Sequence, residues 1–316
     1  MKKQPLVVVV GPTASGKTAA GVILAKEFGG EVVSADSMQI YKSMSISTAK
    51  PTKDEMQGIP HHLIDFLDSD TAFSVADYVS LAREKISDTA GRGKLPILVG
   101  GTGLYVNSLI DNIKFDDTCG NSEIRDRLYA EAQDKGNHYL WERLLHIDPE
   151  TAFAVHENNL SRVVRALEVF EITGEKLSVH KKNSRLEESR YDVCMIGLNF
   201  HDRQLLYDRI NRRVDLMLLN GLVDEAKDFF SEENRYTANQ AIGIKELKPY
   251  LDGKDTLENC VEKIKMESRR YAKRQLTWFR RDGRINWIYL DEDNLLSNPE
   301  ELTKNLKSIV VKSSVL

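Results

Sequence analysis

The stretch GPTASGKT, residues 11–18, has the residue types and spacing of a phosphate-binding loop. Its glycines allow successive backbone N–H groups to converge on phosphate oxygens, and Lys17 adds a positive charge. The Thr18 hydroxyl is suited to hold a magnesium ion beside those phosphates. We therefore expect a diphosphate or a triphosphate to bind at this loop, whose members are Gly11, Pro12, Thr13, Ala14, Ser15, Gly16, Lys17 and Thr18.

Two further polar residues follow apolar runs. Asp36 comes directly after residues 31–35, and Thr102 follows residues 95–99 within the sequence GGTG. Because parallel strands bind ligands at their carboxyl ends, both side chains are expected near the phosphate-binding loop. As alternatives, Asp36 is a turn or helix-cap residue, and GGTG is a tight turn without a binding role. An ATPase with such a loop normally carries a magnesium-positioning carboxylate after this strand, and GGTG lacks one.

The elements that would position these residues alternate between strands and helices. Valines at residues 7–10 predict a buried strand, residues 19–28 predict a helix, and Ser74 with Asp77 predicts the start of another. This order is typical of an α/β fold, a doubly wound parallel sheet of the P-loop NTPase type with helices on both faces. Residues 36–51 fit neither periodicity and are expected to form a long functional loop.

Residues 116–190 have a different character, with charged helical patterns in place of strand-like runs. We expect an all-helical insertion domain here, between the two parts of the α/β core at residues 1–115 and 191–316. In the second part, residues 204–220 predict an amphipathic helix with Leu205 among its buried residues.

Residues 261–281 predict a basic helix with interleaved aromatic side chains, a surface typical of proteins that follow a nucleic-acid backbone. The alternative is a solvated charged helix whose aromatics pack inward. Arg162 and Arg165, at helical spacing, pose the same choice between phosphate contact and a solvated face.

Composition argues against several function classes. The 316 residues carry a net charge of −4 with 41% hydrophobic residues, which is ordinary for a globular protein and argues against a wholesale polyanion binder. The 3 cysteines form no CxxC pair, so neither a disulfide framework nor a zinc site is indicated. Adjacent His61 and His62 would point apart on any regular element, which disfavours a shared metal site. No stretch approaches the roughly 20 apolar residues of a membrane span, and we expect a cytoplasmic protein.

Eight motifs occur in order and together resemble the bacterial tRNA dimethylallyltransferase family. They are GPTASGKT at Gly11, DSMQIYKSMSISTAKP at Asp36, PHHLID at Pro60, LVGGTGLY at Leu98, SRVVRALEV at Ser161, DRINRRVDLMLLNGLVDEA at Asp208, QAIGIKE at Gln240 and YAKRQLTWFR at Tyr271. Only the first is specific by itself, whereas the ordered set is highly specific and spans nearly the whole chain.

The resemblance implies transfer of a dimethylallyl group from dimethylallyl diphosphate to N6 of the adenosine at tRNA position 37, next to the anticodon. The tRNAs would be those that read codons beginning with U. By the same resemblance Asp36 is the general base, and Thr102 hydrogen-bonds near the leaving group or the adenosine. Lys17 and Arg213 would neutralise the diphosphate, and Mg²⁺ at Thr18 is the implied cofactor.

The resemblance also implies contacts to the tRNA anticodon stem-loop. The residues expected to make them are Asp36, Ser37, Met38, Gln39, Thr102, Arg125, Ser161, Arg162, Val163, Val164, Arg165, Gln240, Ala241, Ile242, Gly243, Ile244 and Lys245. No obligate protein partner is evident, and we expect a monomer.

The chain departs from the family pattern at Ser43, Ser45 and Ser47, where glycine, aspartate and glycine are usual, and at Ile244, where an aromatic is common. These positions put the choice among tRNAs in doubt, not the chemistry. Three other functions stay open: a small-molecule kinase, an adenylate isopentenyltransferase, and a non-catalytic RNA-binding protein. The GGTG sequence argues against the first, the basic helix and insertion against the second, and Asp36 against the third.

Overall fold

The computed structural model describes residues 3–114, 120–184, 187–231, 238, 241–293, 295–313 and 315. The chain forms two compact units. The core unit comprises Met1–Ile110 and Ser189–Leu316, and the helical unit comprises Asp111–Glu188.

The core unit contains a sheet of six parallel strands in the order β3-β2-β4-β1-β5-β6. The predicted α/β fold class is confirmed. The strands are β1 (Gln4–Val10), β2 (Gly30–Ser34), β3 (His61–His62), β4 (Leu95–Gly100), β5 (Tyr191–Asn199) and β6 (Ile285–Tyr289). β1 is central, with Val7 opposite Ile97 of β4 and Cys194 of β5, so the loop that follows β1 lies at the middle of the sheet's carboxyl edge.

The edge strand β3 was not predicted from the sequence. It has only two residues, His61 and His62, and pairs with Val32 and Val33 of β2. A run this short carries no alternation that reveals a strand. His62 Nε2 lies 2.7 Å from Glu31 Oε2, so the histidine pair takes part in the sheet edge.

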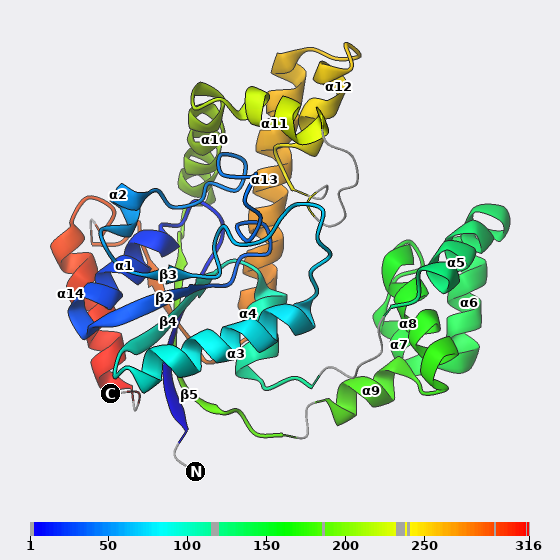
Figure 1. Ribbon diagram of the computed structural model, residues 1–316, viewed down its shortest axis with the longest axis horizontal. Coiled ribbons are helices and arrows are strands. Elements are labelled where there is room, and N and C mark those ends of the chain that lie inside the picture. The colour runs from blue at the N-terminus through cyan, green and yellow to red at the C-terminus, as the bar shows by residue number, and fades with distance from the viewer. Residues whose placement is uncertain are drawn as a thin grey trace. The chain divides into compact units, whose positions relative to one another are not determined.

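Helices cover both faces of the sheet (Figure 1). On one face α1 (Lys17–Phe28) and α14 (Pro299–Lys312) share an apolar core with the strand residues that point toward them, such as Val7 and Ile97. On the other face lie α3 (Val75–Gly91) and α4 (Gly103–Ile110). The predicted capping of α3 is confirmed, since Ser74 and Asp77 exchange hydrogen bonds. Both faces of the sheet are therefore buried, as parallel strands require.

A second apolar core lies beside the loop of residues 36–51, which we call the Asp36 loop. Ile40 and Met44 of this loop pack with residues of α10 (Arg203–Leu219), α11 (Leu222–Ser231) and α13 (Leu257–Phe279). α10 and α13 run side by side (Figure 1). The remaining short elements are α2 (Lys53–Met56), the 3₁₀ helix η2 (Lys245–Leu247) and α12 (Lys248–Leu251).

Two sequence predictions in this region were wrong in detail. α13 begins at Leu257 rather than residue 261, because the Thr256 side chain caps it by accepting a hydrogen bond from Asn259 N. On α10, Leu205 is 39% exposed instead of buried, while Leu206 packs into the core. Ile210 and Val214 of the same helix are also buried, so the apolar face of α10 departs from the prediction at Leu205.

The helical unit is built from α5 (Ser122–Lys135), α6 (Asn137–Ile147), α7 (Pro149–Ala154), α8 (Leu160–Thr173) and α9 (Leu177–Asn183). Its core contains Leu128, Leu140, Leu144 and Leu167. Asp148 starts α7 by accepting a hydrogen bond from Thr151 N at 3.2 Å, and Ser178 N donates to the same carboxylate at 2.9 Å. One buried aspartate therefore ties α7 to α9.

Candidate active site

The phosphate-binding loop follows β1, and its backbone leaves N–H groups available for an anion. Ala14 and Gly16 have positive φ angles of 62° and 84°, a region that alanine enters only when neighbours hold it there. Arg209 Nε donates a 3.0 Å hydrogen bond to the Ala14 carbonyl, which stabilises this turn. α1 begins at Lys17 with no side-chain cap from any described residue, so its first N–H groups can bind phosphate oxygens.

Two cations lie buried beside this loop. Lys17 Nζ donates to the Pro12 carbonyl at 2.8 Å. Arg213 donates from Nη1 to the Thr13 hydroxyl at 2.9 Å and from Nη2 to the Thr48 carbonyl at 3.3 Å. Arg213 Nε is buried and has no hydrogen-bond partner within the described part of the chain. Thr13 and Thr48 hold the Arg213 side chain beside the phosphate-binding loop, where the family resemblance expects it to neutralise the diphosphate.

The electrostatics of the pair favour a bound anion. Burial and the positive charge of Arg213 lower the pKa of Lys17 to about 7, while Asp36 acts in the opposite direction. Burial also lowers the pKa of Arg213. An anion between the two cations would compensate both effects, because it supplies the negative charge that burial makes necessary.

Asp36 lies two residues beyond the end of β2, and it takes part in a turn. Its Oδ1 accepts hydrogen bonds from Met38 N at 2.9 Å and Gln39 N at 3.3 Å. The Thr102 hydroxyl accepts a 3.1 Å hydrogen bond from Ser37 N. Asp36 is therefore a turn residue through its Oδ1 atom, as one of the sequence alternatives proposed. Its carboxylate also lines a cavity. β2 and β4 bring Asp36 and Thr102 together as their order predicted.

α13 closes the site through residues that sequence analysis did not select. The Gln275 side chain accepts a hydrogen bond from Thr13 N at 2.8 Å and donates to the Gly101 carbonyl at 3.0 Å. It therefore joins the phosphate-binding loop to the GGTG turn. Gln275 belongs to the family motif YAKRQLTWFR. The basic residues of that motif predicted a charged outer surface and gave no indication that the glutamine joins two loops of the site.

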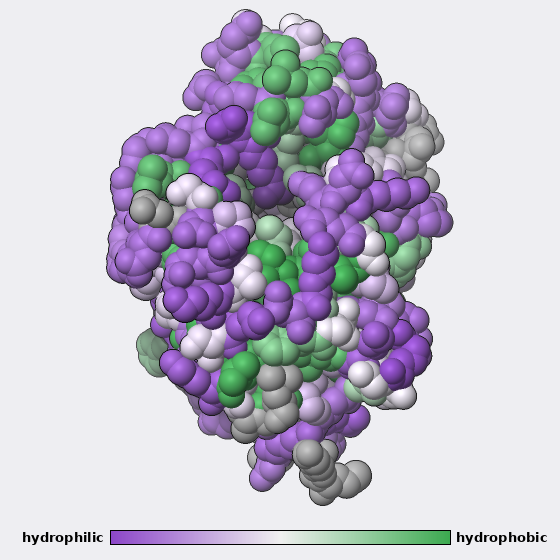
Figure 2. All heavy atoms as spheres, turned by 90° about the vertical axis from the view of Figure 1, so that its left-hand side faces the viewer, coloured by the Kyte–Doolittle hydropathy of each residue, from purple (hydrophilic) through white to green (hydrophobic). Residues whose placement is uncertain are grey.

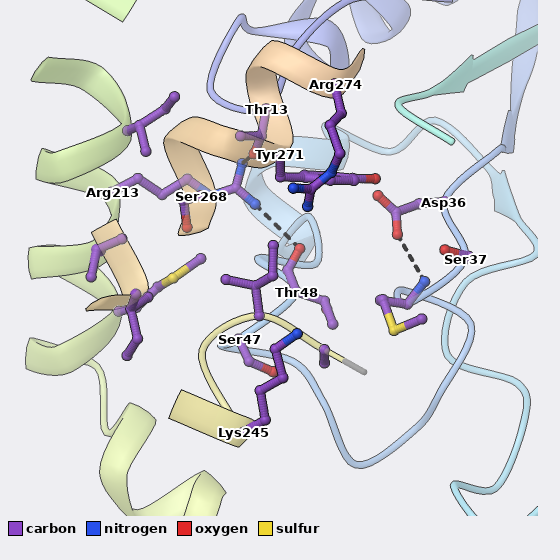
Figure 3. Close-up of a pocket in the computed structure, with 17 residues that line it drawn as sticks. Thr13, Asp36, Ser37, Ser47, Thr48, Arg213, Lys245, Ser268, Tyr271 and Arg274 are labelled. Atoms are coloured by element: carbon purple, nitrogen blue, oxygen red, sulfur yellow. Dashed lines mark hydrogen bonds between the residues drawn. The ribbon is translucent and has the colours of Figure 1, made fainter. Parts of the chain in front are cut away.

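Two cavities meet at these residues. The phosphate-loop cavity, about 550 Å³, is lined by residues that include Lys17, Thr18 and Gly100. The helix cavity, about 320 Å³, is lined in part by α10 and α13 (Figure 3). The residues common to both are Thr13, Asp36, Arg213, Met217 and Tyr271. A ligand with phosphates in the first cavity can therefore extend past Asp36 into the second.

The Asp36 loop is held in place by a carboxylate from α11. Glu225 accepts hydrogen bonds from three consecutive backbone N–H groups, at 2.8 Å from Ser45, 2.7 Å from Ile46 and 2.8 Å from Ser47. Gln39 Nε2 donates to the Thr48 and Ala49 carbonyls, both at 3.2 Å. Ser45 and Ser47, two of the positions that depart from the family pattern, thus contribute backbone groups to this anchor. Glu225 was not predicted as a site residue.

The predicted RNA-contacting segments are distributed over both units. In the core unit, Ala241, Ile242 and Lys245 line the helix cavity, and Ser37 and Met38 line it from the Asp36 loop. Ile244 is fully buried in the second apolar core, which explains why an aliphatic residue suits this position. Gln240 lies outside the described residues.

In the helical unit, α8 carries the predicted segment of residues 161–165. Ser161 and Arg162 are exposed, but Val163 and Val164 are buried in the core of the unit, so their side chains are not available on its surface. Arg165 Nη1 and Arg125 Nε each lie 2.8 Å from the carboxylate of Glu168, whose side chain is 0% exposed. Glu168 therefore brings Arg125 and Arg165 together, although α5 and α8 are far apart in the sequence.

Some basic residues of α13 form ion pairs, and others lie exposed on its surface. Lys265 pairs with Asp215 at 2.9 Å, and Arg270 pairs with Glu267 at 2.6 Å. Lys263 and Lys273 are exposed, as is Arg280 directly after the helix. Both sequence alternatives therefore describe part of this helix, because some of its basic side chains form ion pairs while others are exposed.

Among the described residues, no helix is long and apolar enough to cross a bilayer. The face of the core unit that carries α1, α2 and α14 is mostly hydrophilic, with apolar residues in scattered patches (Figure 2).

The chain is similar to proteins of known function over nearly its full length. A model of the family described as IPP transferase matches residues 39–282. A tRNA dimethylallyltransferase of a Thermoanaerobacter species is 51% identical over 304 residues, which cover 95% of this chain and 96% of that protein. The tRNA dimethylallyltransferase of Bacillus subtilis is 49% identical over 287 residues, covering 90% and 91% of the two chains.

Solved structures show the same relationship. A tRNA isopentenylpyrophosphate transferase from Bacillus halodurans has a TM-score of 0.69 and 44% identity, covering 98% of this chain and 99% of that one. A eukaryotic dimethylallyltransferase acting on tRNA has a TM-score of 0.80 and 30% identity, covering 95% of this chain and 77% of that one.

Proposed function

This chain belongs to the IPP transferase family, and we propose that it acts as a tRNA dimethylallyltransferase. It transfers the dimethylallyl group of dimethylallyl diphosphate to N6 of the adenosine at tRNA position 37 in tRNAs that read codons beginning with U. The observation that carries this proposal is the place of Asp36, a carboxylate at the junction of a phosphate-binding cavity and a second cavity.

The donor diphosphate binds in the phosphate-loop cavity. The first N–H groups of α1, Lys17 and Arg213 stabilise the negative charge that grows on the diphosphate as it departs. The unpartnered Nε of Arg213 supports this role, since a buried guanidinium N–H requires an acceptor. The donor's apolar tail extends toward Ile210, Val214 and Ile264 in the helix cavity.

Magnesium fits this arrangement as an ion shared with the substrate. The described residues contain no group of three or more His, Cys, Asp or Glu side chains that could hold a metal by themselves. Thr18 lines the phosphate-loop cavity, and magnesium is commonly bound by few protein oxygens together with substrate phosphates and water. When bound, Mg²⁺ supplies further charge stabilisation to the leaving diphosphate.

Asp36 acts as the general base. The exocyclic amine of adenine is a weak nucleophile because its lone pair is delocalised into the ring, so removal of its proton assists the attack. The bond between C1 of the donor and the diphosphate oxygen breaks, and its electron pair leaves with the diphosphate. The bond between N6 and C1 forms, and one N6 proton passes to the Asp36 carboxylate.

The tRNA binds with the target base turned out of the anticodon loop, which is least costly for an unpaired base. Residues 241–245, the exposed arginines of the helical unit and the exposed basic residues of α13 contact the RNA. We also propose that the protein works as a monomer in the cytoplasm. A kinase is less well supported because the GGTG turn after β4 supplies no carboxylate.

The proposal is tested with Mg²⁺, dimethylallyl diphosphate labelled in its prenyl group, and an unmodified tRNA with adenosine at position 37. AMP and ATP serve as parallel acceptors. We expect label in the tRNA alone. Label in a free nucleotide would identify an adenylate isopentenyltransferase instead, and label in no acceptor would refute prenyl transfer. The same tRNA with guanosine at position 37 is the matched control.

A further inference from the structure

Tyr271 is placed at the reaction centre by the close packing of α13 on the GGTG turn. A Cβ atom on Gly101 would lie 2.2 Å from Gln275 Nε2, and one on Gly103 would lie 2.3 Å from Trp278 Cδ1. These glycines therefore let the helix approach the turn more closely than any larger residue would allow. Tyr271 lies one turn before Gln275, so the same contact brings its ring beside Thr102 and Asp36.

The surroundings of Tyr271 are those of a ligand-facing ring. It lines both cavities and is one of only five residues that do so among those described. The Arg274 guanidinium carbon lies 5.7 Å from the ring centroid. In Figure 3 the Arg274 guanidinium lies over the ring, and the hydroxyl end of the ring is directed toward the Asp36 carboxylate. Burial and the Asp36 charge raise the pKa of Tyr271 to about 12, so the side chain is neutral.

We infer that the Tyr271 ring is the surface on which the acceptor adenine stacks, with Arg274 extending that surface. The inference rests on the proposed function and identifies a residue that neither the sequence nor the family motif had assigned to the acceptor. The tyrosine hydroxyl lies in the plane of its ring and is directed toward Asp36 (Figure 3). A base stacked parallel to the ring can therefore present one of its own edges to the same carboxylate. Stacking therefore fixes the orientation that delivers the N6 proton to the carboxylate.

The helix cavity leaves a separate place for the prenyl group. Ile210, Val214 and Ile264 form an aliphatic wall from α10 and α13, and a branched five-carbon chain packs well against such side chains. A planar aromatic base matches an aromatic ring and a guanidinium plane better, and these are the groups that bind unstacked bases in RNA-binding proteins. The adenine is therefore assigned to Tyr271, and the donor tail to the aliphatic wall.

The test compares Tyr271→Phe, which keeps the ring, with Tyr271→Leu, which removes it. Tyr250→Leu is the matched control, because Tyr250 is 36% exposed on α12 and lines neither cavity. The first assay uses an anticodon stem-loop RNA with 2-aminopurine in place of the target adenine, without any donor. Wild type, Tyr271→Phe and Tyr250→Leu should keep its emission quenched in the complex, whereas Tyr271→Leu should release it several-fold.

The second assay measures prenylation of the unmodified stem-loop. Tyr271→Leu should lower kcat/KM for the RNA by about 5- to 150-fold, the range for loss of one base–aromatic stack, with the KM for the donor unchanged. Tyr271→Phe should stay within about threefold of wild type. Equal emission in both Tyr271 variants, or a raised donor KM with an unchanged RNA KM, would overturn the inference. A wild type that binds the RNA but transfers no prenyl group would refute the proposed function instead, since the fluorescence assay needs no chemistry.

Discussion

Raising the pH from 8 to 9 should weaken the binding of dimethylallyl diphosphate about ninefold. The reason is that burial and Arg213 lower the pKa of Lys17 to about 7, while only its protonated form complements the diphosphate. The protonated fraction falls from about one in eleven at pH 8 to about one in a hundred at pH 9. Since the bound anion restores a high pKa, binding takes up a proton, and affinity declines as pH rises through and above 7.

Calorimetric titration of the donor without RNA, at constant saturating Mg²⁺, measures this effect. The terminal phosphate contributes little because its second pKa is about 6. Titrations in two buffers with different ionisation enthalpies give the proton uptake, which should be about 0.9 per site at pH 8. The Lys17→Arg variant is the control, because its guanidinium stays charged over the whole range. Equal wild-type affinities at the two pH values, without proton uptake, would refute the electrostatic reasoning.

Substitutions at Asp36, at Glu225 and at the two arginines of α8 test separate parts of the protein. Asp36→Asn should slow single-turnover prenylation of bound tRNA by about 10²- to 10⁴-fold, and a rate within a few-fold of wild type would exclude this residue as the base. Glu225→Ala should lower the free energy of unfolding in urea by about 2–4 kcal/mol and raise KM for both substrates, since three N–H groups lose a charged acceptor. Glu225→Gln should recover part of the stability and part of the KM. An unchanged KM in Glu225→Ala would show that Glu225 contributes to stability alone. Arg162→Glu should weaken tRNA binding in a filter assay without changing the thermal melting curve, whereas Arg165→Glu should weaken binding and lower the melting temperature, because it places a carboxylate beside buried Glu168. Equal melting curves for these two variants would show that the ion pair between Arg165 and Glu168 does not stabilise the helical unit.

Local pattern was sufficient for much of the fold. Phosphate-binding loops, capped helices and buried strands depend on residues close together in the chain, so their sequence signals are complete within short windows. The α3 capping box and the strand at residues 95–100 were predicted within one residue. The edge position of Asp36 and Thr102 also followed, because strand order in a doubly wound sheet obeys general rules.

Only the tertiary structure identified the residues that join these pieces. Gln275 bonds to Thr13, which lies 262 positions away, and Glu225 bonds to Ser45, 180 positions away. Nothing in the local sequence distinguishes such a glutamine or glutamate from a solvated one, since its role is set by the partner that folding brings to it. Val163 and Val164 were expected to contact tRNA because they belong to the family segment 161–165, and the fold buries both side chains.

The sequence by itself therefore determined the phosphate site, the sheet that carries it and the family to which the chain belongs. The tertiary structure decided how the second half of the chain completes the site, through the packing of α10, α11 and α13 against the Asp36 loop. The physical reason is that a turn, a helix cap or a strand depends on the residues within the element itself, so its signal is contained in a short stretch of sequence. The environment of a polar side chain instead depends on charge, burial and hydrogen-bond partners from segments distant in the sequence.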